Sequence, residues 1–166
     1  METAQLRRAA TRHRKVGPDF GGVFACDRLP RYADKKSYII NLDPAHKEGS
    51  HWVAVFFDRT TGSVDYFDSY GLKPKNVHII RFLKRNSVFK HYNLHTYQSP
   101  CSVICGQYSL YFLFHRSHGH PMKVVQRRLH STMKASNDRR VVRFGNLTTR
   151  LPYIDPICSQ ISKSLL

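Results

Sequence analysis

Two apolar segments that follow each other closely, HWVAVFF at residues 51–57 and SVDYFD at residues 63–68, decide the fold. Four polar residues at 58–61 and then Gly62 separate them, which predicts an antiparallel β-hairpin with a short turn. Segment 51–57 is apolar at nearly every position, so we expect both of its faces to be covered. The hairpin is therefore expected inside the fold rather than on its surface.

Further strands and helices are expected around this hairpin. Their composition predicts strands at 37–42 and 90–98, and apolar spacing predicts a helix at 76–86. The long apolar segment 105–115 predicts a buried helix. Two basic helices are expected, the first amphipathic, at 122–134 and 137–150, and a basic arm or short helix at 1–17. Together these elements predict a single α+β domain over residues 1–166.

The chain is strongly basic, with 27 Lys and Arg against 11 Asp and Glu, which gives a net charge of +16. Such an excess predicts a polyanionic partner, most simply nucleic acid, although a basic surface can also serve solubility alone. Few of these cations adjoin aromatic residues, so binding is expected through phosphates without sequence preference. The candidate contacts are Arg7, Arg8, Arg12, Arg14, Lys15, Lys84, Arg85, Arg127, Arg128, Arg139 and Arg140.

The cysteines and the apolar segments indicate a reduced, soluble protein. The spacing of the four cysteines fits neither a disulfide scaffold nor a zinc ribbon, and they are Cys26, Cys101, Cys105 and Cys158. The arginines near the start leave no apolar stretch for a secretory signal, although an Arg-rich start also suits a mitochondrial transit peptide. The longest apolar run, 108–114, is too short to span a bilayer, so no membrane partner is expected.

Three histidines, at 115, 118 and 120, raise the alternative of a metal site. No carboxylate or cysteine that could complete a ligand set is close to them in the sequence. We therefore expect these histidines to mark the end of a helix, and no metal is expected.

The hairpin places a histidine opposite an aspartate. If residues 58–61 form the turn, Phe57 pairs with Gly62 and His51 lies opposite Asp68. Directly opposed side chains lie about 4.5–5.5 Å apart at Cβ, close enough for a carboxylate to hold an imidazole N–H. Asp65 would instead face Ala54 and point to the other side of the sheet. Since a slip of one residue reverses every side chain, a chance arrangement remains the alternative.

Cys105 is expected in the first turn of the apolar helix, where the helix dipole favours an anion. A cysteine there, beside a histidine, can have its pKa lowered to about 3.5–7.5 and act as a nucleophile. Gly106 would leave room for a substrate backbone, and the Gln98 amide could donate to an oxyanion. The alternatives are a buried core cysteine and an ordinary surface glutamine.

Three segments together resemble the adenovirus protease (adenain-like) family of cysteine peptidases. They are GSHWVA at 49–54, DSYG at 68–71 and QSPCSVICG at 98–106, and GVF at 22–24 and DRLP at 27–30 add to the likeness. The resemblance implies an adenain/ubiquitin-like-protease-type fold, with a mixed central sheet packed between helices. It also implies roles for particular residues: Cys105 as nucleophile, His51 as general base, Asp68 as the orienting group (often Glu in the family), Gln98 as oxyanion donor, and Trp52 beside the site.

The resemblance further implies an endopeptidase that cleaves viral capsid or core precursors at glycine-containing sites, in the virion and host nucleus. Double-stranded DNA would be a cofactor, no metal or organic cofactor would be needed, and a monomer is expected. An activating viral peptide is also implied, but Ser87 occupies the position of the family's disulfide-forming cysteine. Two other functions stay open: a non-enzymatic basic DNA-binding virion core protein, and a protease of ubiquitin-like modifiers.

Overall fold

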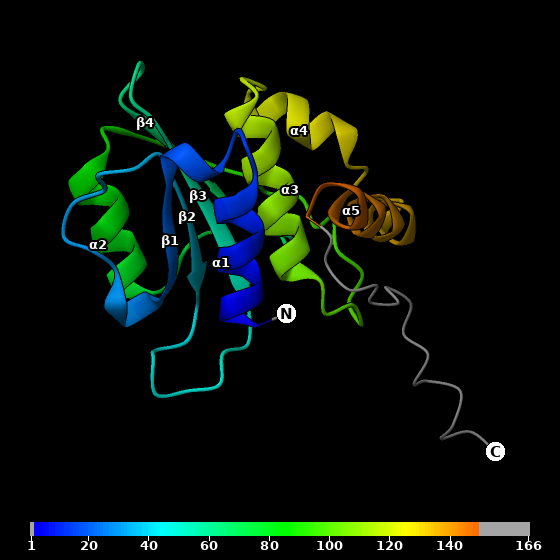
Figure 1. Cartoon of the computed structure of the whole chain (residues 1–166), viewed down its shortest axis with the longest axis horizontal. Coiled ribbons are helices and arrows are strands. Elements are labelled where there is room, and N and C mark those ends of the chain that lie inside the picture. Colours follow the sequence, from blue (N-terminus) through cyan, green and yellow to red (C-terminus); the bar gives the residue numbers. More distant parts are fainter. Residues whose placement is uncertain (1, 150–166) are drawn as a thin grey trace.

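A five-stranded mixed sheet, in the order β1-β2-β3-β4-β5, forms the centre of the computed structural model, which describes residues 2–149 (Figure 1). The outer pairs β1–β2 and β4–β5 are parallel, and the inner pairs β2–β3 and β3–β4 are antiparallel. The strands are β1 Phe20–Ala25, β2 Ser37–Asn41, β3 Trp52–Asp58, β4 Ser63–Phe67 and β5 Phe89–Tyr92.

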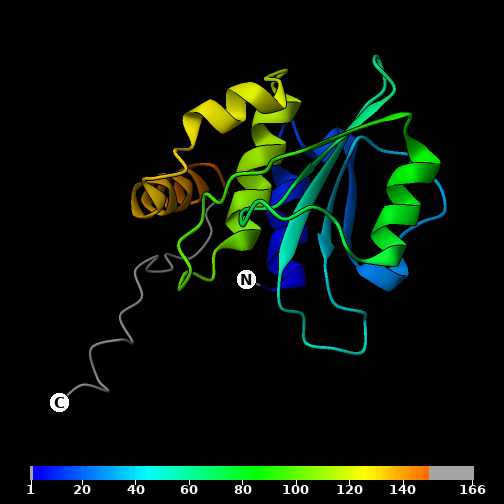
Figure 2. The ribbon, with the colours of Figure 1, turned by 180° about the vertical axis from the view of Figure 1, so that it is seen from behind.

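Helices cover both faces of this sheet. The helix α2, Val77–Asn86, packs on one face, and the other face carries α1 Thr3–Arg12, α3 Cys105–Ser117, α4 Met122–Arg128 and α5 Lys134–Thr149 (Figures 1 and 2). Two short 3-10 turns, Gly17–Asp19 and Cys26–Arg28, flank β1. The expected α+β fold, with a mixed sheet between helices, is confirmed. Within residues 2–149, no helix has both the length and the apolar character needed to cross a membrane.

The central strand β3 is buried on both faces, as its apolar sequence predicts. Val53, Val55 and Phe57 pack into the core beneath α2, whereas Ala54 and Phe56 pack into the core beneath α3. Successive residues of a strand point to opposite faces, so one strand supplies both cores. The sequence of β3 thus determines the three-layer arrangement.

The pairing of β3 with β4 differs from the prediction by two residues. Ala54 pairs with Phe67 instead of Asp65, and Phe57 pairs with Val64 instead of Gly62. The turn keeps four residues but moves by one, to 59–62, because Asp58 still belongs to the ladder and pairs with Ser63. A shift of two residues leaves every side chain on its predicted face.

Two other predicted elements are too long. The strand predicted at 90–98 ends at Tyr92, because the N–H groups of Tyr97 and Gln98 both donate to the Ser69 carbonyl instead of continuing a ladder. The helix predicted at 122–134 ends at Arg128, and the last helix begins at Lys134 rather than 137. The connecting turn is held by Asn137, whose side chain bonds the His130 N–H at 2.9 Å and the His130 carbonyl at 2.6 Å.

A buried ion pair joins the sheet to α3. Arg116 Nε lies 2.7 Å from Asp65 Oδ2, and these side chains are 9% and 4% exposed. The Arg116 guanidinium also lies over the Phe56 ring, 4.5 Å from its centroid. His91 adds a contact of 3.0 Å to Asp65, but its side chain is 58% exposed. The sequence prediction gave Asp65 no partner, because Arg116 is distant in the chain.

Removing the buried cation should be far more costly than removing the exposed one. Arg116→Ala leaves the buried Asp65 carboxylate with only the exposed His91 beside it, so the free energy of unfolding should fall by about 3–5 kcal/mol. His91→Ala, the matched control on the same carboxylate, should cost less than about 1 kcal/mol. Urea denaturation of both variants measures the difference, and equal losses would contradict it.

Candidate active site

His51 and Asp68 meet at the shared end of the two central strands. His51 precedes β3 and Asp68 follows β4, and the His51 Nε2 lies 2.8 Å from Asp68 Oδ1. Extending the observed register places His51 opposite Tyr70, and these two rings lie 5.1 Å apart at their centroids. Asp68 is thus the diagonal neighbour of His51, not the opposed residue that the sequence predicted, and is still within reach.

Cys105 is the first residue of α3, the helix that packs on β3. No side chain caps the start of this helix, so its backbone N–H groups and positive dipole end remain directed at Cys105. The thiol hydrogen-bonds the His51 imidazole and the Trp52 backbone. Because Nε2 of His51 faces Asp68, the other ring nitrogen, Nδ1, is the one left for Cys105.

The electrostatics of this pair favour a thiolate beside an imidazolium. Burial by itself would raise the pKa of the Cys105 thiol, but the hydrogen bonds from His51 and Trp52 outweigh it and lower that pKa. Burial likewise opposes the charging of His51, yet the hydrogen bonds to Asp68 and Cys105 raise the pKa of His51 to about 9. Both shifts favour the ion pair at neutral pH.

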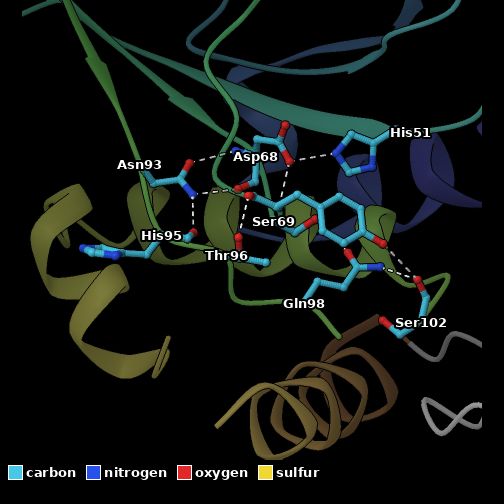
Figure 3. Close-up of polar contacts among 9 residues, drawn as sticks. His51, Asp68, Ser69, Asn93, His95, Thr96, Gln98 and Ser102 are labelled. Carbon is cyan, nitrogen blue, oxygen red and sulfur yellow. Dashed lines mark hydrogen bonds and ion pairs between the residues drawn. The ribbon is translucent and has the colours of Figure 1, made fainter. Parts of the chain in front are cut away.

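Asp68 is fixed through one carboxylate oxygen, Oδ1, and through its backbone. Its side chain is 1% exposed, and the Tyr70 N–H donates to the same Oδ1 at 2.8 Å. The Asn93 side chain bonds both backbone groups of Asp68: Oδ1 accepts its N–H at 2.8 Å, and Nδ2 donates to its carbonyl at 2.6 Å (Figure 3). Asn93 therefore replaces a rung of the β4–β5 ladder just where β5 ends.

Gln98 is buried, at 1% exposure, and both ends of its amide are bonded. Its Oε1 accepts from the Ser69 hydroxyl at 2.7 Å, and its Nε2 donates to the Ser102 carbonyl at 2.5 Å (Figure 3). Ser102 lies three residues before Cys105. Gln98 is thus an ordered side chain held in the segment leading to Cys105, not an ordinary surface glutamine.

The two residues assigned to the substrate cleft lie in different surroundings. Trp52 begins β3 directly after His51 and packs, partly buried, against the core beneath α3. Gly106 is buried, and a Cβ there would lie 3.0 Å from Cδ2 of Leu6 in α1. The structure therefore gives a packing reason for Gly106, close approach of α1, in place of the predicted room for substrate.

All of the proposed nucleic-acid contacts are exposed, but they do not form one patch. Most belong to α1 and the residues after it, to α4 and to α5, on one side of the sheet. Lys84 and Arg85 end α2 on the opposite side (Figure 2). The predicted surface is therefore divided, and only the group on the side of α1, α4 and α5 shares a face of the sheet.

The histidines at the end of α3 pack against aromatic rings. His115 lies 4.4 Å from Tyr111 and His118 lies 4.1 Å from Phe114, measured between ring centroids. Among the described residues, no group of three or more His, Cys, Asp or Glu side chains is placed to hold a metal ion. Cys158 lies outside the described residues.

Sequence reasoning missed the residues that hold the site together. Asn93 lies outside the family-like segments, and Ser69, although it lies in DSYG, was given no role there. Asn93 contacts Asp68 over 25 positions of sequence, and Ser69 contacts Gln98 over 29. The one available signal was the strand-like segment after residue 90, whose asparagine and polar residues fit a strand poorly.

The fold and the site define a class: α+β proteins with a cysteine at a helix start and a His–Asp pair at the end of a central hairpin. Residues 20–146 match the family described as the adenovirus endoprotease. The chain therefore belongs to the adenovirus endoprotease family, as the sequence resemblance suggested.

Individual proteins agree with this assignment. A candidate thiol protease of Acanthamoeba polyphaga mimivirus is 36% identical over 92 residues, which cover 50% of this chain and 30% of that protein. A protease of Bovine adenovirus 4 is 29% identical over 111 residues, 57% of this chain and 55% of that protein. The crystal structure of the ASFV protease has the same fold, with a TM-score of 0.58 at 18% identity, over 75% of this chain and 60% of that one. The chain thus spans less than two thirds of each of these proteins.

Gly71 should be needed for the close approach of the 68–71 segment to the loop after β5. Its φ is +74°, and a Cβ there would lie 2.7 Å from the His95 backbone. Gly119 has a similar φ of +81° but no atom within 4 Å, so it is a matched control. Gly119→Ala should lower the free energy of unfolding by about 1–2 kcal/mol through backbone strain alone. Gly71→Ala should cost about 1–3 kcal/mol more in urea denaturation, and equal effects would refute the close approach.

The pH dependence of Cys105 alkylation should report the ion pair. Since the pKa of Cys105 is lowered, iodoacetamide should label it faster at neutral pH than a thiol of ordinary pKa, about 8.5. His51→Ala removes the His51 hydrogen bond and charge but leaves burial and the hydrogen bond from Trp52, so the pH midpoint of labelling should rise above that of the wild type. Mass spectrometry of Cys105 across pH 4–10 measures both midpoints. An unchanged midpoint in His51→Ala would contradict the pairing.

Proposed function

We propose that the chain is a cysteine endopeptidase that uses Cys105, His51 and Asp68. The observation that carries this proposal is the continuous order Asp68–His51–Cys105, with 2.8 Å between His51 Nε2 and Asp68 Oδ1 and a hydrogen bond from His51 to Cys105. A buried thiolate beside an oriented imidazolium at a helix start is an activated nucleophile. The family assignment supports the same chemistry.

The proposed reaction is acyl transfer through a thioester. The Cys105 sulfur attacks the peptide carbonyl carbon, and the oxyanion that forms accepts hydrogen bonds from the Cys105 N–H and Gln98 Nε2. His51 gives its proton to the departing amine as the C–N bond breaks. Water then attacks the thioester, His51 takes one of its protons, and the carboxylate product leaves with Cys105 restored. Asp68 orients His51 and stabilises its charge.

The burial of the reacting groups supports cleavage beside glycine. Cys105 is 9% exposed and the His51 side chain 12%, and the Tyr70 ring and Trp52 stand beside them. A substrate with no side chain near the scissile bond approaches such a narrow site most easily. We propose glycine-containing sites in viral capsid or core precursors as substrates, and the virion and host nucleus as the location of the protein.

DNA is the proposed cofactor, on the strength of the charge. The chain carries +16, and its exposed cations on α1, α4 and α5 share one side of the sheet. Binding would be to phosphates of duplex DNA, without sequence preference and weaker at high salt. Residue 87, at the end of α2, is a serine, and its hydroxyl donates to the Leu83 carbonyl at 2.7 Å. Because serine has no thiol, an activating viral peptide would bind without a disulfide there. No metal or organic cofactor enters the proposed reaction, and the protein is proposed to act as a monomer.

A cleavage panel tests this function and separates it from its alternatives. The substrates are glycine-containing capsid-type peptides and Gly-Gly fusions of ubiquitin-like proteins, each with and without duplex DNA at two salt concentrations. Capsid-type peptides should be cut, and DNA should raise the rate at low salt only. Cys105→Ala should abolish cleavage, and His51→Ala should lower kcat by about 10²–10⁴-fold.

The control is Cys26→Ala, a buried cysteine on the α2 side of the sheet, which should keep full activity. Cleavage of the Gly-Gly fusions alone would favour the protease of ubiquitin-like modifiers. DNA binding without any cleavage would favour the non-enzymatic core protein.

A further inference from the structure

The side chain of Ser69 does not touch Cys105, His51 or Asp68 in any described contact, yet it is buried at 1% exposure. Its hydroxyl donates to Oε1 of Gln98 at 2.7 Å (Figure 3). Ser69 also holds Gln98 by its backbone, because its carbonyl accepts the N–H groups of Gln98 at 3.1 Å and of Tyr97 at 2.8 Å. One residue therefore fixes both the main chain and the side chain of Gln98.

The partners at the two ends determine which way the Gln98 amide faces. The Ser102 carbonyl only accepts hydrogen bonds, so the amide nitrogen must face it, at 2.5 Å. The amide oxygen must then face Ser69, whose hydroxyl must donate. A flipped amide would set its oxygen against the Ser102 carbonyl oxygen in a buried place, which brings two acceptors together and leaves the amide oxygen unsatisfied. The Ser102 carbonyl therefore selects the orientation of the amide, and the hydrogen bond from Ser69 holds the amide in place at its other end.

The orientation of the Gln98 amide determines where its two N–H groups point. The Gln98 Nε2 has two N–H groups, and the Ser102 carbonyl takes one of them. The other is the donor proposed for the oxyanion. Without the Ser69 hydroxyl, the amide oxygen is left buried without its donor, and the amide is held at one end only. Its second N–H would then no longer be kept in position for the oxyanion.

The position of Ser69 links this donor to the rest of the site. It follows Asp68, whose backbone is bonded on both sides by Asn93, so the Ser69 backbone starts from a fixed point. It precedes Tyr70, whose N–H donates to the Asp68 carboxylate and whose carbonyl accepts from Thr96 at 2.8 Å. Within residues 68–70, Tyr70 thus holds the Asp68 carboxylate and Ser69 holds Gln98.

We propose that Ser69 is a positioning residue that orients Gln98 so that its Nε2 faces the oxyanion formed on the substrate. This inference rests on the proposed function for its effect on cleavage. Ser69 acts through Gln98 and has no part in the Cys105–His51 ion pair, so its loss should affect the transition state and not the thiolate.

A double-mutant cycle in the full chain tests the proposal. Ser69→Ala should lower kcat by about 10–10²-fold with little change in KM, since an oxyanion donor acts in the transition state. In the Gln98→Ala background, the same substitution should cause no further loss. The pH midpoint of Cys105 alkylation should stay at the wild-type value. Ser63→Ala is the matched control: this serine lies on β4, is 6% exposed and bonds Thr61 at 2.7 Å, and it should keep full kcat.

An NMR measurement keeps the proposal testable apart from activity. The side-chain NH₂ signals of Gln98, assigned by their loss in Gln98→Ala, should shift in Ser69→Ala, and their hydrogen exchange should quicken about tenfold or more. Unchanged signals would overturn the positioning role even if the wild type cleaves no peptide. Equal losses of kcat from Ser69→Ala with and without Gln98 would also overturn it. A wild type without cleavage but with the expected NMR change would reject the proposed function alone.

Discussion

The hydrogen bond between His51 and Asp68 is the interaction on which the site depends. It joins the start of β3 to the residue after β4, at one end of the central hairpin. Because β3 is buried on both faces, its position is fixed by the two cores, and so is the backbone that carries His51. The bond sets the orientation of the imidazole, and thereby directs Nδ1 toward Cys105.

Three separate parts of the chain meet at this bond. The hairpin supplies His51 and Asp68, the helix α3 supplies Cys105, and the loop after β5 supplies Gln98. The loop is attached to the hairpin through Ser69 and Asn93, and α3 is attached to the sheet by the Asp65–Arg116 ion pair. These attachments are buried and polar, so each leaves an unsatisfied group when one partner is removed. The site is therefore held by directional contacts as well as by the apolar cores.

The distribution of acidic residues explains part of the basic surface. Asp65, Asp68 and Asp138 are buried, at 3%, 1% and 1% exposure, and all serve internal contacts. They are drawn from only 11 acidic residues in the chain, whereas the proposed DNA-contacting cations all lie on the surface. These three acids thus contribute to internal structure, and their absence from the surface adds to the excess of positive charge there that the DNA proposal requires.

From the sequence alone one can predict the hairpin, the burial of its first strand, the start of α3 at Cys105 and the contact between His51 and Asp68. These follow from local patterns: apolar runs, turn residues and the two-residue period of a strand, which made the pairing insensitive to a register error of two. The folded structure was needed to find the partner of Asp65, the packing of Leu6 on Gly106, and the roles of Ser69 and Asn93. Their contacts join residues far apart in the chain, and a hydrogen bond of that kind leaves no periodic pattern in the sequence.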